Sequence, residues 1–431
     1  MAEYANIIVD IFNEKLDKTF QYRIPEAMKE KLTLGMQVYV PFGKRNIKGY
    51  VVELTDEPEF EVAKIKEIIG IVTDSVPIES QLIALAGWMK KNYGATMNHA
   101  LKTVIPIKKK SNAVEHKSVR LKLTEIEAKS ELAEFVGKDE ALCFSTGFTV
   151  NEGVIPQLAG RGDYIICDDR DHASIVDGRR LSFATQLKYK HNDMDALEKE
   201  LQKCEPDAIK LIVVDSVFSM EGDLANLPEI VRLKKKYNAS IYVDEAHGLG
   251  VFGRQGRGVC DHFGVTEDID LIMGTFSKSL ASIGGFVAGD KDVINWLRHN
   301  ARSYIFQASN TPAATAAARE AIHIFKTEPE RQQRLWEITN YSLKRFRESG
   351  FEIGETESPI IPLYVRDTDK TFEVTKLAFD EGVFINPVIP PACAPQDTLV
   401  RFALMATHTK EQVDFAIEKL IKCFKQLDIL K

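Results

Sequence analysis

The chain has 431 residues, of which 44% are hydrophobic and 28% charged, and its formal net charge is -7. This size and composition predict two or three globular domains with large cores, and the acidic balance argues against a protein that works mainly by binding nucleic acid. The N-terminus has no basic and apolar leader, and no run reaches the length of a membrane span, so we expect a cytoplasmic protein. The six cysteines are widely spaced and include no Cys-x-x-Cys pair, which predicts reduced thiols and no metal site.

The first 120 residues differ from the rest in charge and in pattern. They carry 18 Lys and Arg against 15 Asp and Glu, whereas the remainder carries 38 against 48. Short β-prone runs at 7–11, 19–22, 36–40 and 48–52 are separated by glycine and proline. They predict a small β-barrel or sandwich, followed by a helix over 79–93. Three lysines at 108–110 lie in an expected linker over 108–129.

Residues 1–123 resemble the N-terminal, 3′-DNA-end-binding domain of the replication-restart helicases (primosomal protein N′). The resemblance is carried by Thr19–Pro25, Gly35–Gly43 and Ile47–Val51. It implies a β-rich domain over 1–107 that holds a DNA 3′ end, with Phe20 and Tyr22 as candidate base-stacking residues. Positions in the barrel core are the alternative for both rings. Gln21 stands where the family commonly has an acidic residue, and no GxxxxGK[ST] loop for a helicase motor occurs in the chain.

From about Glu125 the pattern changes to an alternation of strands and helices. Apolar runs at 164–167, 211–215, 241–244, 271–274 and 286–288 read as strands, and helical stretches such as 227–237 fall between them. This alternation predicts an α/β domain with a mainly parallel sheet. Ligands of such sheets collect at the carboxyl ends of the strands, which is where the polar motifs of this chain cluster.

Four of these motifs suit pyridoxal phosphate (PLP). Lys278 follows the 271–274 strand among hydroxyl residues, as a lysine that forms a Schiff base does. Asp244 ends a strand and can pair with a protonated pyridine nitrogen, and His247 follows three residues later. His172 offers a ring that can stack on a cofactor, and the stretch Thr146–Thr149 leads into a helix whose N-terminus can bind phosphate. Each motif alone has an ordinary structural explanation, but their joint occurrence favours a PLP site.

Together these motifs resemble the α-oxoamine synthase family of PLP enzymes, which has fold type I, over about residues 130–431. The bacterial serine palmitoyltransferases are the most similar members. The supporting stretches are Asp168–Gly178, Val217–Leu227, Val243–Gly253, Gly274–Gly285, Asn386–Cys393, Leu399–Arg401 and Thr407–Thr409. The resemblance implies a PLP-binding large domain over 130–325 with a mainly parallel central sheet, and a small C-terminal α+β domain over 326–431.

The same resemblance implies a role for each site residue. Lys278 would hold PLP and later move the α-proton of the substrate, Asp244 would pair with the ring nitrogen, and His172 would stack on the ring. Arg401 would bind the substrate carboxylate through its bidentate fork. The family forms obligate homodimers. The other expected contacts to the ring or its phosphate come from Gly147, Phe148, Ser219, His247, Thr275 and Ser277, and from Ser309, which would reach the phosphate held by the other subunit.

The implied reaction joins an amino acid, serine or else glycine, to an acyl-CoA or acyl-carrier thioester with loss of carbon dioxide. Within the family, 2-amino-3-ketobutyrate CoA ligase and 8-amino-7-oxononanoate synthase are alternatives. The family's N-terminal arm and its glycine-rich segment are not found before the match, and no glycine occurs between Gly94 and Gly137. We therefore expect turnover that is weak or absent. Two other hypotheses are a DNA-end-binding module with an inactive PLP-fold passenger, and a junction of two unrelated gene pieces. The complete set of PLP residues favours the enzyme.

Overall fold

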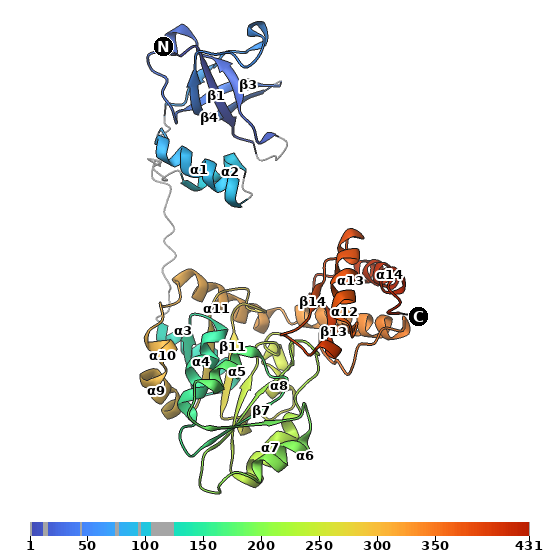
Figure 1. The fold of residues 1–431 in the computed structure, drawn as a ribbon. Coiled ribbons are helices and arrows are strands. Elements are labelled where there is room, and N and C mark those ends of the chain that lie inside the picture. Colours follow the sequence, from blue (N-terminus) through green and yellow to red (C-terminus); the bar gives the residue numbers. More distant parts are fainter. Residues whose placement is uncertain are drawn as a thin grey trace. The chain divides into compact units, whose positions relative to one another are not determined.

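The structure is a computed structural model that describes residues 2–11, 16–43, 45–73, 77–93, 96–104 and 125–430 (Figure 1). The chain divides into two compact units, Met1–Val119 and Arg120–Lys431. Most of the linker expected over 108–129 lies outside the described residues, and helix α3 (Glu125–Val136) is the first element after it. Within these ranges, no helix combines the length and the apolar character needed to cross a membrane.

The first unit is an antiparallel sheet followed by two helices. Its strands lie in the order β2-β1-β4-β3-β5. The elements are β1 (Tyr4–Val9), β2 (Phe20–Arg23), β3 (Gln37–Phe42), β4 (Arg45–Thr55), β5 (Gly70–Ile71), α1 (Ser80–Tyr93) and α2 (Met97–Val104). Alternate side chains such as Ile7 and Val9 enter one buried cluster, while Ile8 enters a second cluster with residues of α1 and α2. The predicted strands and the predicted helix are confirmed.

The second unit is built on a seven-stranded sheet with the order β6-β12-β11-β10-β9-β7-β8. β12 pairs antiparallel with both of its neighbours, and the other pairings are parallel. The strands are β6 (Glu140–Phe144), β7 (Tyr164–Asp168), β8 (Thr185–Tyr189), β9 (Lys210–Asp215), β10 (Ser240–Asp244), β11 (Leu271–Thr275) and β12 (Gly285–Gly289). Ile212 and Val214 pack in one core cluster and Leu211 and Val213 in another, because successive side chains point to opposite faces. The predicted mainly parallel sheet is confirmed, and both of its faces are buried.

Helices connect these strands and cover the sheet (Figure 1). They are α4 (Gly147–Leu158), α5 (Ala173–Arg180), α6 (Met194–Leu201), α7 (Leu227–Tyr237), α8 (Val259–His262), α9 (Lys291–Asn300), α10 (Arg302–Ile305) and α11 (Pro312–Thr327). Helix α7 spans the range that the sequence predicts. Asn226 caps its first turn, and Asn238 ends it in the left-handed conformation with φ 50°.

The C-terminal part has a core of its own. The antiparallel sheet β13-β15-β14 comprises β13 (Ile360–Tyr364), β14 (Asn386–Val388) and β15 (Leu399–Ala403), and it packs with α12 (Glu330–Glu348), α13 (Thr368–Asp380) and α14 (Lys410–Gln426). It closely approaches the connection between β9 and α7 at Gly222, which has φ 73°, and a Cβ there would lie 2.2 Å from the Ile360 carbonyl oxygen. Only glycine fits both the conformation and the space. The predicted small α+β domain is confirmed as part of the fold.

Candidate active site

Lys278 lies in a tight turn at the carboxyl end of β11. The turn is closed by the Phe276 N–H, which donates to the Gly284 carbonyl at 2.9 Å, and by the Thr275 and Ser277 hydroxyls, whose oxygens are 2.9 Å apart. Lys278 is an exposed residue, but the protein around its ammonium group partly desolvates this group. This burial lowers the pKa of Lys278; the charges of Asp244 and Asp215 oppose the shift, and that of Arg401 reinforces it.

Asp244 ends β10 and is buried, yet its carboxylate is well bonded. Its Oδ1 accepts the Ala246 N–H at 2.9 Å, and its Oδ2 accepts an N–H from the Asn151 side chain at 2.8 Å. Asn151, on α4, is fully buried, and it was not among the residues predicted for the site. The carboxylate therefore has a fixed orientation at the edge of the sheet where Lys278 also lies.

His172 caps the N-terminus of α5. Its backbone N–H donates to Asp215 Oδ2 at 2.6 Å, and its Nδ1 accepts the Ser174 N–H at 3.2 Å. The Phe148 ring meets the imidazole edge-on, with centroids 6.4 Å apart. Burial lowers the pKa of His172 despite the nearby charge of Asp244. The imidazole is therefore neutral at neutral pH.

His247 is the second imidazole of the site. Burial holds the pKa of His247 well below its usual range, and the positive charges of Lys278 and Arg401 act in the same direction. The neutral His247 ring thus lies close to both Lys278 and Arg401. The charges of the predicted aspartate, lysine and arginine thus act on the pKa values of Lys278 and of the two histidines, which places these residues close together.

The N-terminus of α4 packs against the lysine turn. Thr146 caps the helix and forms a reciprocal pair of hydrogen bonds with Thr149. A Cβ on Gly147 would lie 2.6 Å from Thr275 Oγ1, so the approach of helix and turn depends on glycine. Phe148 is partly exposed and Ser277 exposed. Free amides at a helix start, with hydroxyls beside them, suit a phosphate group.

Arg401 enters the site from β15 of the small domain. Its neighbours across the sheet are Pro362 and Asn386. Its Nε is buried and has no hydrogen-bond partner among the described residues, and burial lowers the pKa of its guanidinium. An unpaired buried donor of this kind is costly unless a ligand accepts its hydrogen bond. The guanidinium therefore fits a carboxylate ligand.

Two further residues predicted for the site, Ser219 and Ser309, come from other segments of the chain. Ser219 is half-buried in the turn after β9, and Ser309 is exposed between α10 and α11. Their contacts to the ring and to a second subunit stay predictions.

In the first unit, Tyr22 is a core residue, and its hydroxyl donates to the Pro41 carbonyl at 3.3 Å. This is the barrel-core alternative, whereas Phe20 is half-buried and lies edge-on to Phe42 at 5.1 Å.

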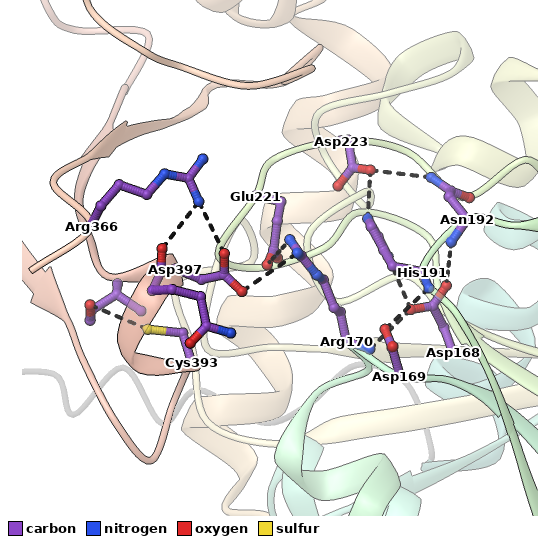
Figure 2. A network of polar contacts seen from close by, with 12 residues as sticks. Asp168, Asp169, Arg170, His191, Asn192, Glu221, Asp223, Arg366, Cys393 and Asp397 are labelled. Atoms are coloured by element: carbon purple, nitrogen blue, oxygen red, sulfur yellow. Dashed lines mark hydrogen bonds and ion pairs between the residues drawn. The ribbon is translucent and has the colours of Figure 1, made fainter.

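An ionic clamp that the sequence did not reveal holds the turn that carries His172 (Figure 2). His191 lies between two carboxylates, with Nδ1 2.9 Å from Asp168 and Nε2 2.9 Å from Asp223. Burial disfavours the charged imidazole, but hydrogen bonds to both carboxylates outweigh burial and raise the pKa of His191 to about 10. The Asn192 N–H also donates to Asp168 at 2.8 Å. His191 is therefore an imidazolium at neutral pH, in contrast to His172.

The same turn is tied to the small domain. Arg170 pairs with Glu221 at 2.8 Å and approaches Asp397 at 3.8 Å, and Asp397 in turn pairs with Arg366 at 3.0 Å (Figure 2). Arg170 lies two residues before His172, and Asp397 lies four residues before Arg401. The alternating charges thus connect the segment that carries the stacking imidazole to the segment that carries the guanidinium.

Comparisons with known proteins agree with this arrangement. The family model for aminotransferase class I and II matches residues 94–420, and the model for the 3′DNA-binding domain (3′BD) matches residues 6–106. The chain belongs to the class I and II aminotransferase family. Both predicted resemblances and the predicted fold type are confirmed.

Individual relatives refine the comparison. Serine palmitoyltransferases of Bacteroides ovatus and Bacteroides thetaiotaomicron are each 80% identical over 305 residues, which cover 71% of this chain and 77% of theirs. An 8-amino-7-oxononanoate synthase of Thermoanaerobacter pseudethanolicus is 42% identical, covering 70% of this chain and 77% of its own. Among solved structures, the serine palmitoyltransferase of Sphingomonas wittichii is 32% identical with a TM-score of 0.69, covering 82% of this chain and 86% of its own. A serine palmitoyltransferase solved with PLP is 31% identical with a TM-score of 0.69, covering 82% and 85%.

Proposed function

We propose that the chain is a PLP-dependent acyltransferase that joins serine to an acyl thioester with loss of carbon dioxide. The observation that carries the proposal is that Lys278, Asp244 and His172 lie together at the edge of the large sheet, with Asp244 and His172 joined through Asn151 and Ser174. The charges of Asp244 and of Arg401, from the small domain, act on the pKa of Lys278. Relatives that are 80% identical are serine palmitoyltransferases, and a solved relative holds PLP. These comparisons support the predicted cofactor and reaction class.

The residues of the proposed site fit PLP. The start of α4 at Gly147 and the hydroxyls of Thr275 and Ser277 offer donors for its phosphate. Asp244, which is fixed by two hydrogen bonds, would pair with the pyridine nitrogen, and the neutral His172 would lie against the ring. Ser219 and His247 complete the proposed contacts. PLP, when bound, spreads the negative charge that develops at the substrate α-carbon over its ring.

Lys278 and Arg401 would carry out the proton transfer and bind the substrate. Lys278 Nζ would hold the cofactor and then, as a free amine, take the α-proton of serine, a task that its lowered pKa favours. Arg401 would bind the serine carboxylate with the donor that is buried and unpaired in the described structure. In the overall reaction, the α-carbon bonds to the acyl carbonyl carbon, the thiol departs, and the carboxyl group leaves as carbon dioxide.

A direct test combines a spectrum with a turnover assay. The purified chain with PLP should show a visible absorbance band that changes on addition of serine and that Lys278→Ala abolishes. Absence of the band, or its survival in Lys278→Ala, would refute the cofactor assignment.

Condensation of serine with palmitoyl-CoA is expected to be slower than in the Bacteroides thetaiotaomicron relative, since the match covers 77% of that enzyme. Equal rates would contradict this expectation, and preference for glycine would favour the alternatives within the family.

A second candidate function belongs to the first unit, because residues 6–106 match the 3′DNA-binding domain. We propose that this unit contacts a DNA 3′ end through Phe20, beside which the Lys18 ammonium lies 5.5 Å from the ring centroid. Tyr22 would support this surface from the core. The Gln21 side chain already has hydrogen-bond partners in the chain: its Nε2 donates to the Glu57 carbonyl, and its Oε1 accepts the Glu59 N–H. The test is binding of a labelled single strand with a 3′ hydroxyl: Phe20→Ala should weaken it, while Phe60→Ala, at an exposed aromatic, should not.

The remaining proposals concern organisation. We propose a 1–107 domain, a 108–129 linker, a 130–325 large domain and a 326–431 small domain, in keeping with the two compact units. We also propose a homodimer in which Ser309, exposed in the single chain, reaches the other subunit's phosphate; light scattering that reports a monomer would refute it. A cytoplasmic location is proposed because the six cysteines are unpaired.

A further inference from the structure

Asn151 connects two residues that the proposed cofactor would touch on different sides. It lies on α4, and its side chain is fully buried. Its Nδ2 donates to Asp244 Oδ2 at 2.8 Å and to Ser174 Oγ at 2.8 Å. Its Oδ1 accepts the Tyr242 hydroxyl at 2.6 Å. The amide is therefore held in one orientation, because a flipped amide would set its oxygen against the Asp244 carboxylate.

The contact with Ser174 extends to His172. Ser174 Oγ lies 2.8 Å from His172 Nδ1, and the Ser174 backbone N–H donates to the same nitrogen at 3.2 Å. Since Ser174 Oγ accepts from Asn151, its own proton is free to point at His172. The Ser174 backbone N–H can only donate, so Nδ1 acts as an acceptor, and the Ser174 hydroxyl can give it a second hydrogen bond. The proton of the neutral imidazole must then lie on Nε2.

We propose that Asn151 is a positioning residue that fixes the Asp244 carboxylate directly and fixes the orientation and tautomer of His172 through Ser174. The consequence for the cofactor rests on the proposed function. One rigid hydrogen-bond network would then hold both the residue at the edge of the cofactor ring and the residue at its face. Every polar atom of the Asn151 side chain is used, and a buried network of this kind is rigid only when it is fully satisfied. The Nε2 proton would then be available to a substrate carboxylate.

The first measurement reads the tautomer without any cofactor. Nitrogen-15 NMR of histidine-labelled protein distinguishes protonated from unprotonated ring nitrogens, and His172→Gln assigns the signal. In the wild type, the proton of His172 should lie on Nε2. Ser174→Ala removes the hydroxyl donor and should give a mixture of tautomers, and Asn151→Asp should change the spectrum in the same direction. A tautomer on Nδ1 in the wild type, or one unchanged in both variants, would overturn the proposal.

The second measurement is PLP affinity by absorbance titration, with the circular dichroism of bound PLP as the signature of ring orientation. Asn151→Asp keeps the shape but replaces a donor with an acceptor next to Asp244, so affinity should fall about 10-fold or more. Tyr242→Phe, which frees one side of the amide, should have a smaller effect. Asn300→Asp is the matched control, because the Asn300 side chain bonds only to the Trp296 carbonyl in the described structure.

The outcomes separate this inference from the proposed function. If the wild type binds no PLP, the proposed function fails, and the NMR result still decides whether Asn151 sets the tautomer. If the wild type binds PLP and Asn151→Asp binds it equally well with unchanged circular dichroism, the positioning role is refuted. Thermal unfolding of each variant establishes that it is folded. If Asn151→Asp does not fold, the same measurements on Ser174→Ala and Tyr242→Phe decide the question.

Discussion

Replacement of His191 by glutamine should remove the clamp that holds the His172 turn. The imidazolium bonds to Asp168 and to Asp223, each at 2.9 Å (Figure 2). Glutamine carries no charge and can donate to only one of the two carboxylates in that geometry. The variant therefore leaves two close carboxylates without the cation that separates them, and loss of one partner from a buried ionic group is strongly destabilising.

The size of the effect follows from the pKa of His191. A rise from 6.5 to about 10 in the folded protein corresponds to a stabilisation of about 5 kcal/mol at most. The Asp168 side chain is fully buried, but those of His191 and Asp223 retain 16% and 15% exposure, so about 3 kcal/mol is expected after solvent screening. Because the folded pKa is the raised one, the contribution is complete below pH 6.5. It is lost as the pH rises through 10.

Urea unfolding at a series of pH values tests this reasoning. The difference in free energy of unfolding between wild type and His191→Gln should be about 3 kcal/mol near pH 6.5 and should shrink toward pH 10. His299→Gln is the control, because His299 is exposed on α9 and bonds to the Asn295 carbonyl. It should match the wild type throughout. A difference for His191→Gln that is absent, or that is the same at both ends of the pH range, would refute the ionic clamp.

Three other changes give distinct outcomes. Gly222→Ala should cost about 3 kcal/mol in urea unfolding, because φ is 73° and the added Cβ would meet the Ile360 carbonyl; wild-type stability would contradict the close approach. Gly147→Ala should weaken PLP binding about 10-fold in an absorbance titration, since its Cβ would displace Thr275, and unchanged affinity would argue against a phosphate site there. Arg170→Gln should weaken serine binding a few-fold, measured by the spectral change, whereas Arg180→Gln, which breaks an exposed pair with Asp177, should not.

The sequence predicted the parts of the fold whose signals are local. Continuous apolar runs identified the inner strands of the large sheet, and the asparagines on either side of 227–237 mark the ends of α7. Strand β8 was missed because it lies at the edge of the sheet, where Thr185, Gln186 and Lys188 face solvent. Such a strand lacks the apolar run on which the predictions depended.

The site divides in the same way. Lys278, Asp244 and His172 were predictable because each lies at or just after the end of a strand, and the carboxyl ends of parallel strands share one edge. Asn151 was not, since a polar residue in a helix ordinarily faces solvent, and its partner Asp244 is 93 residues away. The pairing of Arg170 with Asp397, and the clamping of His191 between carboxylates, likewise depend on how distant segments meet. Tyr22 shows the reverse case, in which packing places a candidate surface ring in the core.

The charged groups of the proposed site explain why it suits a ligand with two anionic groups. Lys278 and Arg401 are the cations, while burial keeps His172 and His247 neutral. Burial raises the pKa of Asp215 well above its usual range, with the charge of Asp244 acting in the same direction, because these two carboxylates lie close together. The buried Nε of Arg401 has no hydrogen-bond partner among the described residues, so the carboxylates of the site leave this donor unpaired. A phosphate at the start of α4 and a carboxylate at Arg401 would supply the missing anions, and both would lower the cost of keeping these cations out of bulk water.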